Sequence, residues 1–399
     1  MTESVRSPLS TPEIASVLTL AMGMPMMVFY GIGVLGPQLI RDLGLSQSEL
    51  AWLTTSSFGV AALVSPWAGE AVQHLGMKKG LMGLFLLVGI SFFLMAVLPG
   101  FLGLVLAMLL CGLAQSLANP ATNMAIAKLV PAGRKPTMVG IKQSGVQISA
   151  LVAGLVLPFF ALWIGWRGAL AIWVPLALGM LLLVRRRIPA ADTVATGLRL
   201  SNLTRPNTLL ALLMVIQLCA GLTLSAYITF FGVYAHELGI SARMTGTMVS
   251  VFGVMGIVSR IGLTPLGSRL RDEAQLLAVL FILASLAVYV SSLATPSQHF
   301  PLWLGIVGLG LTAVATNAIA MSMLMRDERF GKVAPSAGML SVGFFGGFAL
   351  GPPLFGLLLS SPQGFGVAWF FLMGTAMSGA ILSLVLCRIR ARGCSNDVR

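Results

Sequence analysis

Acidic residues are scarce in this chain. Its 399 residues include 12 Asp and Glu against 25 Lys and Arg, so charged side chains make up only 9% of the sequence. A soluble globular domain carries roughly 25% charged residues, so this chain has too few to cover a surface that faces water. The composition excludes an ordinary soluble protein. With 57% hydrophobic residues and a mean hydropathy of +0.94, it predicts a membrane protein with many spans.

Histidine and cysteine are also rare, and their spacing excludes most chemistry. The 3 His and 4 Cys show no metal-ligand or disulfide spacing, and the sequence has no phosphate-binding loop and no nucleophile–base set. We therefore expect no enzyme activity, no cofactor and no metal site.

Long apolar runs fill most of the sequence. The first, of about 27 residues, is longer than a signal-peptide core and is interpreted as a retained helix. In all, the runs predict twelve membrane-spanning helices, at residues 14–40, 49–72, 80–98, 101–128, 136–160, 161–184, 207–235, 243–267, 274–294, 300–325, 333–360 and 365–388.

The net charge of +13 follows the predicted topology. Of the 25 Lys and Arg, 20 lie at the termini and in the even-numbered loops, whereas the odd-numbered loops contain 3: Arg41, Arg167 and Arg243. Cytoplasmic loops collect Lys and Arg, so we expect a multi-pass protein of a bacterial inner membrane with both termini in the cytoplasm. The charge is thus a topology signal, and we expect no nucleic-acid binding.

One stretch of sequence, which we call the repeated phrase, occurs twice. The stretch LGLSQSELAWLTTSSFGVAALVS at residues 43–65 resembles LGISARMTGTMVSVFGVMGIVS at residues 238–259. At an offset of 198 residues, Asn119 also meets Asn317, and Gly145 meets Gly343. The repeat predicts two six-helix bundles of the same orientation, related by an axis along the membrane normal. We expect a monomer with an N-terminal bundle at 1–184, a basic cytoplasmic linker at 185–206, and a C-terminal bundle with a short cytoplasmic tail at 207–399.

Two motifs add to this architecture. Between the second and third helices the chain has GEAVQHLGMKKG, which matches Gly-x3-Asp-(Arg/Lys)-x-Gly-(Arg/Lys)-(Arg/Lys) at Gly69, Gly76 and Lys78 but has Gln73 and His74 at the charged positions. The pattern Gly-x8-Gly-x3-Gly-Pro is complete in the eleventh helix and partial in the fifth. The residues that match it are Gly338, Gly347, Gly351 and Pro352, and Gly145 and Gly154.

With the twelve spans and the repeat, these motifs resemble those of the major facilitator superfamily over the whole chain. The resemblance implies a secondary transporter that works by alternating access, with its small-molecule site between the bundles. It also implies that helices 1, 4, 7 and 10 line the cavity, that helices 2, 5, 8 and 11 lie beside it, and that the matching glycines serve helix packing and gating.

Two basic residues lie well inside predicted helices, Lys142 in the fifth and Arg260 in the eighth. A charge at the centre of a span costs about 2.5–3.5 kcal/mol on insertion scales, so such residues are usually functional. No Asp, Glu or His lies equally deep, although Glu70 is near one helix end. A positive interior favours an anion, and a guanidinium fits a carboxylate with two hydrogen bonds.

We therefore predict that Arg260 and Lys142 bind a small organic anion, as in the monocarboxylate, oxalate and nitrate carriers that this pattern resembles. The alternatives are that either side chain extends toward the cytoplasmic head groups, or that Arg260 braces the adjacent loop. Further candidates for the site are Tyr30, Asn119, Asn317, Gln143 and Tyr227.

The direction and coupling of transport stay open at this point. Proton symport, with Lys142 releasing its proton when the site is empty, competes with anion exchange. The main alternative function is proton-coupled efflux of drugs or metabolites, which the glycine pattern favours, and a sensor without transport activity is a third.

The loop charges generate a topology prediction. A reporter fused after Arg187 or at the C-terminus should be cytoplasmic, and one inserted near Gly44 should lie outside the cell, because the loop Lys and Arg divide 20 against 3. Reporter activity on the wrong side at any of these positions would contradict the twelve-span topology.

Overall fold

The chain folds as helices joined by short turns. The computed structural model describes residues 10–189, 205–269, 272–331 and 333–396. Within these ranges the helices are α1 (Thr11–Leu43), α2 (Gln47–Val97), α3 (Gly100–Leu129), α4 (Lys135–Ala171), α5 (Trp173–Arg187), α6 (Thr208–Glu237), α7 (Ala242–Arg269), α8 (Glu273–Ser292), α9 (Phe300–Arg326), α10 (Val333–Leu359) and α11 (Phe365–Asn396), with 3-10 turns η1 (Ala132–Arg134) and η2 (Glu328–Phe330). The predicted all-α fold with many spans is confirmed.

Two of the long apolar segments are long enough to cross the membrane twice. Among the described residues ten helical segments are long and apolar enough to span it, and two of these, Gln47–Val97 and Thr137–Arg187, have 51 residues each. Such a length is about 76 Å at 1.5 Å per residue, more than twice the hydrocarbon thickness of about 30 Å. The backbone leaves the helical region at Gly76 (φ 79) and Gly165 (φ 71), conformations that suit glycine. The remaining eight segments and these two double ones account for the twelve predicted crossings.

The repeated phrase contains a signal that stops one helix and starts the next. Gly44 ends α1 with φ 64, and Ser46 then caps α2 in a reciprocal pair of hydrogen bonds with Glu49. In the second copy Gly239 has φ 76, and the Ser241 hydroxyl accepts a hydrogen bond from the first turn of α7. The phrase recurs because each bundle has the same tight turn between its first two spans.

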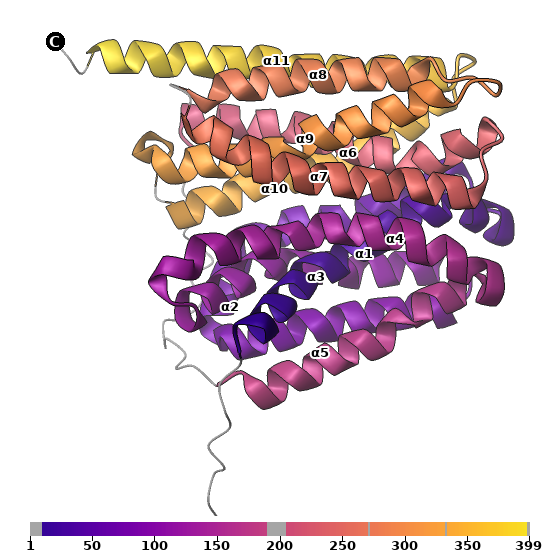
Figure 1. The fold of residues 1–399 in the computed structure, drawn as a ribbon, viewed down its shortest axis with the longest axis horizontal. Helices are drawn as coiled ribbons and strands as arrows, with labels where there is room; N and C mark the ends of the chain where they lie inside the picture. The colour runs from indigo at the N-terminus through magenta and orange to yellow at the C-terminus, as the bar shows by residue number, and fades with distance from the viewer. Residues whose placement is uncertain (1–9, 190–204, 270–271, 332, 397–399) are drawn as a thin grey trace, which may run out of the picture.

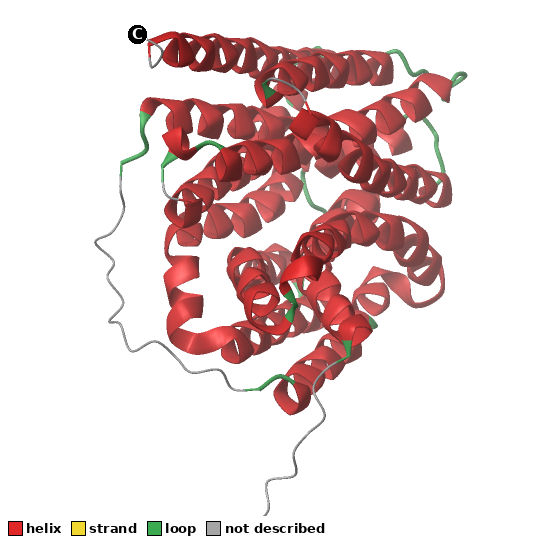
Figure 2. Ribbon diagram, turned by 60° about the vertical axis from the view of Figure 1, so that its left-hand side comes forward, coloured by secondary structure: helices red, strands yellow, loops and turns green. Residues whose placement is uncertain are grey.

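Two groups of helices lie side by side. Figure 1 shows α1–α5 in one half of the molecule and α6–α11 in the other, and Figure 2 shows the same division from a second direction. The groups meet where α1 packs on α6, α2 on α10 and α4 on α7. The sequence repeat relates the second span, in α2, to the eighth, α7, and the fifth span, in α4, to the eleventh, α10. Under this relation the α2–α10 contact and the α4–α7 contact are equivalent.

Most of the predicted linker, residues 190–204, lies outside the described residues. Before it α5 continues to Arg187, and after it Asn207 caps α6 by accepting a hydrogen bond from the Leu210 N–H. The last helix extends to Asn396, beyond its predicted end at 388, so that a helix occupies much of the expected tail. The three-part domain division itself stays a prediction.

Glycines allow the two groups of helices to touch through their backbones. Gly154 of α4 and Gly246 of α7 face each other, and a Cβ at either would collide with the carbonyl oxygen of the other. Gly232 of α6 meets the Gly33 carbonyl of α1 in the same way. Small residues commonly permit such close helix contacts in membranes.

The other motif glycines divide into two kinds. Gly145 packs on the backbone of α1, and Gly347 and Gly351 pack on the backbone of α6, so these three sites require a hydrogen in place of a side chain. At Gly69, by contrast, a Cβ would meet no described atom within 4 Å, and Pro352 lies inside α10. The predicted gating role of these residues stays a prediction.

Ion pairs gather at one end of the molecule, which we call the basic end. Arg390 of α11 binds Asp272, Glu273 at 3.7 Å, and Asp327 at 3.1 Å, and it therefore joins α8, the α9–α10 turn and α11. Partial burial tends to raise the pKa of Asp327, but hydrogen bonds from Arg329 and the charges of Arg329 and Arg390 outweigh it, so that its pKa is lowered.

The glycine contact between α4 and α7 generates a stability prediction. Gly246→Val should lower the thermal unfolding temperature of the purified protein by about 1–4 °C, because its side chain must push α4 away. The matched control is Gly179→Val on α5, where a Cβ meets no described atom within 4 Å. Both variants carry the same cost of valine in a helix, so equal unfolding temperatures would rule out a tight contact.

Candidate functional site

A cavity of about 790 Å³ lies between the two groups of helices. Residues of α1, α3, α6 and α9, which are the predicted helices 1, 4, 7 and 10, line it together with residues of α4, α7 and α10. Its lining extends to Thr137, Met325 and Arg326 at helix ends on the basic side. The cavity therefore opens toward the basic end.

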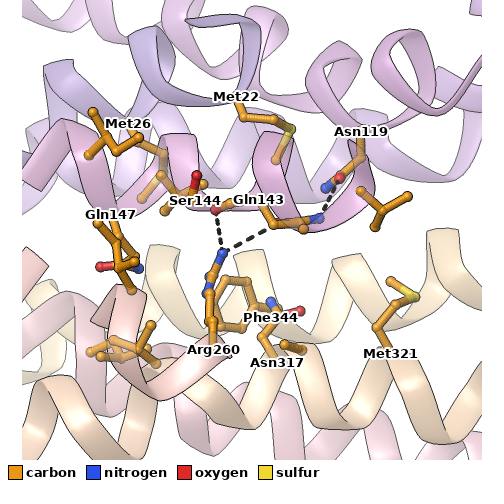
Figure 3. A pocket seen from close by; sticks show the side chains of 18 of the residues that line it. Met22, Met26, Asn119, Gln143, Ser144, Gln147, Arg260, Asn317, Met321 and Phe344 are labelled. Atoms are coloured by element: carbon orange, nitrogen blue, oxygen red, sulfur yellow. Dashed lines mark hydrogen bonds between the residues drawn. The ribbon is translucent and has the colours of Figure 1, made fainter. Parts of the chain in front are cut away.

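Arg260 of α7 reaches across the cavity to α4. Its Nη1 donates to the backbone carbonyl of Gln143 at 2.7 Å and to the Oε1 atom of Gln143 at 3.4 Å (Figure 3). Gly256, one turn earlier on α7, packs on the Gln147 side chain, and Gly253, two turns earlier, packs on the Gln147 backbone, which brings the two helices close enough for this contact. The Nε atom of Arg260 is buried and has no partner, so the guanidinium retains an unused donor.

Arg260 also lacks a charged partner. Among the described residues that line the cavity there is no Asp, Glu, Lys or His. The second cation in the lining, Arg326, lies at the basic end and forms an ion pair with Glu273 at 3.5 Å. The described lining thus places an uncompensated positive charge at Arg260, and it is a charge suited to a planar anion.

Lys142 lies behind the cavity wall. Its side chain is 1% exposed, and it is not among the lining residues. The Nζ atom donates to three oxygens of α3: Asn123 Oδ1 at 2.6 Å, Thr122 Oγ1 at 3.0 Å and Asn119 Oδ1 at 3.3 Å. Three neutral acceptors match the three donors of an ammonium group, so the charge is solvated by protein oxygens inside the first group of helices.

A continuous set of hydrogen bonds joins Lys142 to Arg260. Asn119 Oδ1 accepts from Lys142 and also from the Gln143 side chain at 3.4 Å, and Gln143 in turn accepts from Arg260. We call this set, Lys142–Asn119–Gln143–Arg260, the polar chain. It connects a buried cation of one group of helices to the cavity cation of the other.

The remaining predicted residues divide between the cavity and the interior. Tyr30 and Asn317 line the cavity with Asn119 and Gln143. Tyr227 lies outside the lining, fully buried, with its hydroxyl 2.8 Å from that of Ser291. A direct contact between substrate and either Tyr227 or Lys142 is therefore not part of the site as it stands here.

Sequence reasoning missed several lining residues. Gln147 follows Gln143 by one helical turn on α4, and Ser144 lies next to Gln143; both line the cavity (Figure 3). Phe344 and Phe348, also one turn apart, line it from α10. The four-residue spacing was a usable signal, but apolar membrane helices contain many such pairs.

Comparison with known proteins gives a family. The family model of the Major Facilitator Superfamily matches residues 18–334. The chain is similar to the "Transcription regulatory protein OpdE" of Pseudomonas aeruginosa, with 23% identity over 95% of this chain and 94% of that protein. It is also similar to the "Quinolone resistance protein NorA" of Staphylococcus aureus, with 26% identity over 59% of this chain and 63% of that protein.

Solved structures share the fold. Two crystal structures of a bacterial homolog of the human lysosomal transporter Spinster, described as inward-facing and occupied and as inward-facing and unoccupied, align with TM-scores of 0.68 and 0.69. Each alignment has 15% identity and covers 95% of this chain and 96% of the other. At this identity the likeness concerns the arrangement of helices alone.

Proposed function

The chain belongs to the major facilitator superfamily, whose members are transporters and not enzymes, and we propose that this secondary transporter carries an organic anion, a carboxylate, across a bacterial inner membrane. The supporting observation is Arg260, which faces the cavity without a carboxylate partner among the described lining residues. An unpaired cation at this depth is costly, and an anionic substrate would supply the missing charge. The unused Nε donor of Arg260 would contribute to the hydrogen bonds that hold it.

The orientation of the protein is part of the proposal. The basic end, where Arg326, Arg329 and Arg390 lie, would face the cytoplasm with both termini, because most Lys and Arg of the sequence belong to the termini and the even-numbered loops. The cavity, which opens toward that end, would then exchange substrate with the cytoplasm in this conformation. Rocking of the two bundles about the cavity would open it to the other side.

Coupling to protons is proposed through Lys142. Its hydrogen-bond partners Asn119, Thr122 and Asn123 are all neutral, and the polar chain connects it to the substrate position. A carboxylate bound at Arg260 favours a protonated Lys142, whereas the empty site favours release of the proton, since two positive charges then lack an anion. Anion and proton would enter together and leave together.

Efflux is the second candidate function, and the similarity to NorA favours it. The described lining has no carboxylate with which to bind a cationic drug. An exporter built on this site would therefore carry neutral or anionic compounds. Efflux and uptake of an anion differ in direction, not in the role of Arg260.

Replacement of Arg260 tests the anion site. Arg260→Lys should abolish or severely reduce transport of carboxylates into proteoliposomes while the protein remains folded and inserted, because an ammonium lacks the guanidinium fork. The matched control is Arg243→Lys, at the exposed far end of the same helix. Near-normal transport by Arg260→Lys, with both proteins equally well folded, would remove Arg260 from the site.

The coupling mechanism is tested in proteoliposomes without internal anion. The wild-type protein should accumulate a carboxylate when an inward proton gradient is imposed, and Lys142→Gln should not. Lys128→Gln, which changes an exposed lysine near the end of α3, should behave as the wild type. If the wild type moves anion only into vesicles preloaded with anion, and ignores the gradient, the protein is an exchanger and Lys142 is a fixed charge.

A further inference from the structure

The size of the cavity constrains the body of the substrate. A carboxylate head at Arg260 would fill only a small part of about 790 Å³. Sites for drug-sized ligands typically measure about 300–1,000 Å³ and enclose most of the ligand. A small acid such as acetate would leave most of this cavity to water, so the volume leaves room for an anion that carries a ring or a larger apolar body.

One set of polar lining groups surrounds Arg260 on α4 and α7, and further polar groups, Asn317 and Ser341 among them, lie on α9 and α10. Arg260, Gln143 and Asn119 form the polar chain, and Ser144 and Gln147 lie next to them on α4 (Figure 3). The rest of the lining is largely apolar and includes six aromatic side chains: Phe29, Tyr30, Phe252, Phe344, Phe345 and Phe348. The substrate would place a polar head on α4 and α7 and an apolar body against the rings.

The aromatic rings form a connected array from both bundles. Phe344 and Phe348 of α10 have centroids 4.8 Å apart, and Phe348 lies 5.4 Å from Phe29 of α1. Phe58 of α2, itself buried, packs behind them at 4.5 Å from Phe348. These separations lie within the 4.5–7 Å range in which aromatic pairs attract. A flat ring would find edge and face partners from α1 and α10 together.

The charge of the substrate follows from the cations in the lining. Arg260 has no charged partner among the residues that the structure describes, whereas Arg326 forms an ion pair with Glu273 at the basic end. A second carboxylate held among the rings would be desolvated without a counter-charge, which is costly. A single negative charge therefore suits the site better than two.

We infer that the substrate is an aromatic monocarboxylate, whose carboxylate binds Arg260 and whose ring stacks among Phe29, Phe344 and Phe348. This inference rests on the proposed function, since it assigns the body of the anion that Arg260 holds. Ring stacking is specific for aromatic bodies. It should favour an aromatic ligand over a saturated one of equal size by about 2- to 12-fold in affinity.

A ligand series on the purified full-length protein tests the inference. Binding is measured from the shift in thermal unfolding temperature against concentration, and transport from uptake into proteoliposomes. Benzoate is compared with cyclohexanecarboxylate, which matches its charge and ring size without π electrons, and with acetate, phthalate and benzylamine. We expect benzoate to bind best, cyclohexanecarboxylate several-fold more weakly, and acetate, the dianion phthalate and the cation benzylamine poorly.

Variants of the lining phenylalanines test whether their rings cause the preference for benzoate over cyclohexanecarboxylate. Phe344→Leu and Phe348→Leu should each reduce the ratio of benzoate to cyclohexanecarboxylate affinity toward one, and Arg260→Lys should weaken both ligands alike. Phe370→Leu is the matched control, because Phe370 is 69% exposed on α11, away from the cavity. Phe344 is only partly buried, so its variant should fold even if the Phe348 variant is unstable.

The outcomes separate the two proposals. If benzoate and cyclohexanecarboxylate bind equally, or phthalate binds best, and binding still requires Arg260, the inference fails and the anion transporter stands. If acids bind no better than benzylamine, or binding ignores Arg260→Lys, the proposed function fails as well. A benzoate preference that survives both Phe344→Leu and Phe348→Leu would also overturn the assignment to the rings.

Discussion

The hydrogen bond from Arg260 to the backbone carbonyl of Gln143 joins the two bundles across the cavity. A guanidinium inside a membrane protein must find acceptors, because water is scarce and the charge is costly to leave unsolvated. Here a carbonyl on the opposite bundle provides one. If the substrate is a carboxylate, as proposed, it would compete for the same donors with a full negative charge, and substrate binding would then be linked to the contact between the bundles. A ligand that changes this contact shifts the balance between conformations only by the difference in its affinity for them.

The buried cation on the other bundle is arranged differently. Lys142 has three oxygen partners on α3 and little exposure, so its charge does not depend on a substrate for hydrogen bonds. Its influence on the cavity passes through Asn119, which it shares with Gln143. One bundle thus holds its cation behind the wall, and the other presents its cation to the cavity. This asymmetry gives the two basic residues separate tasks, although they lie at similar predicted depths.

The helices and their order could be predicted from the sequence because apolar length, loop charge and the internal repeat are properties of the chain alone. The face that each helix turns to its neighbours could not be predicted from the chain alone. Successive helical residues are about 100° apart, so Gln143 lines the cavity while Lys142 points into the bundle, and Ile228 lines it while Tyr227 does not. The main partner of Arg260 is a backbone carbonyl, which no side-chain pattern identifies. The depth of a residue along its helix could be predicted from the sequence. The direction in which its side chain points required the packed structure.

The close glycine contacts between the bundles lie on the side of the cavity away from the basic end. Backbone contact at Gly154 with Gly246, and at Gly33 with Gly232, holds the bundles together through packing. Packing contacts of this kind gain little from the hydrophobic effect in a bilayer, because lipid tails are as apolar as the side chains they replace. They can therefore separate at modest cost, which suits an interface that must open during each transport cycle.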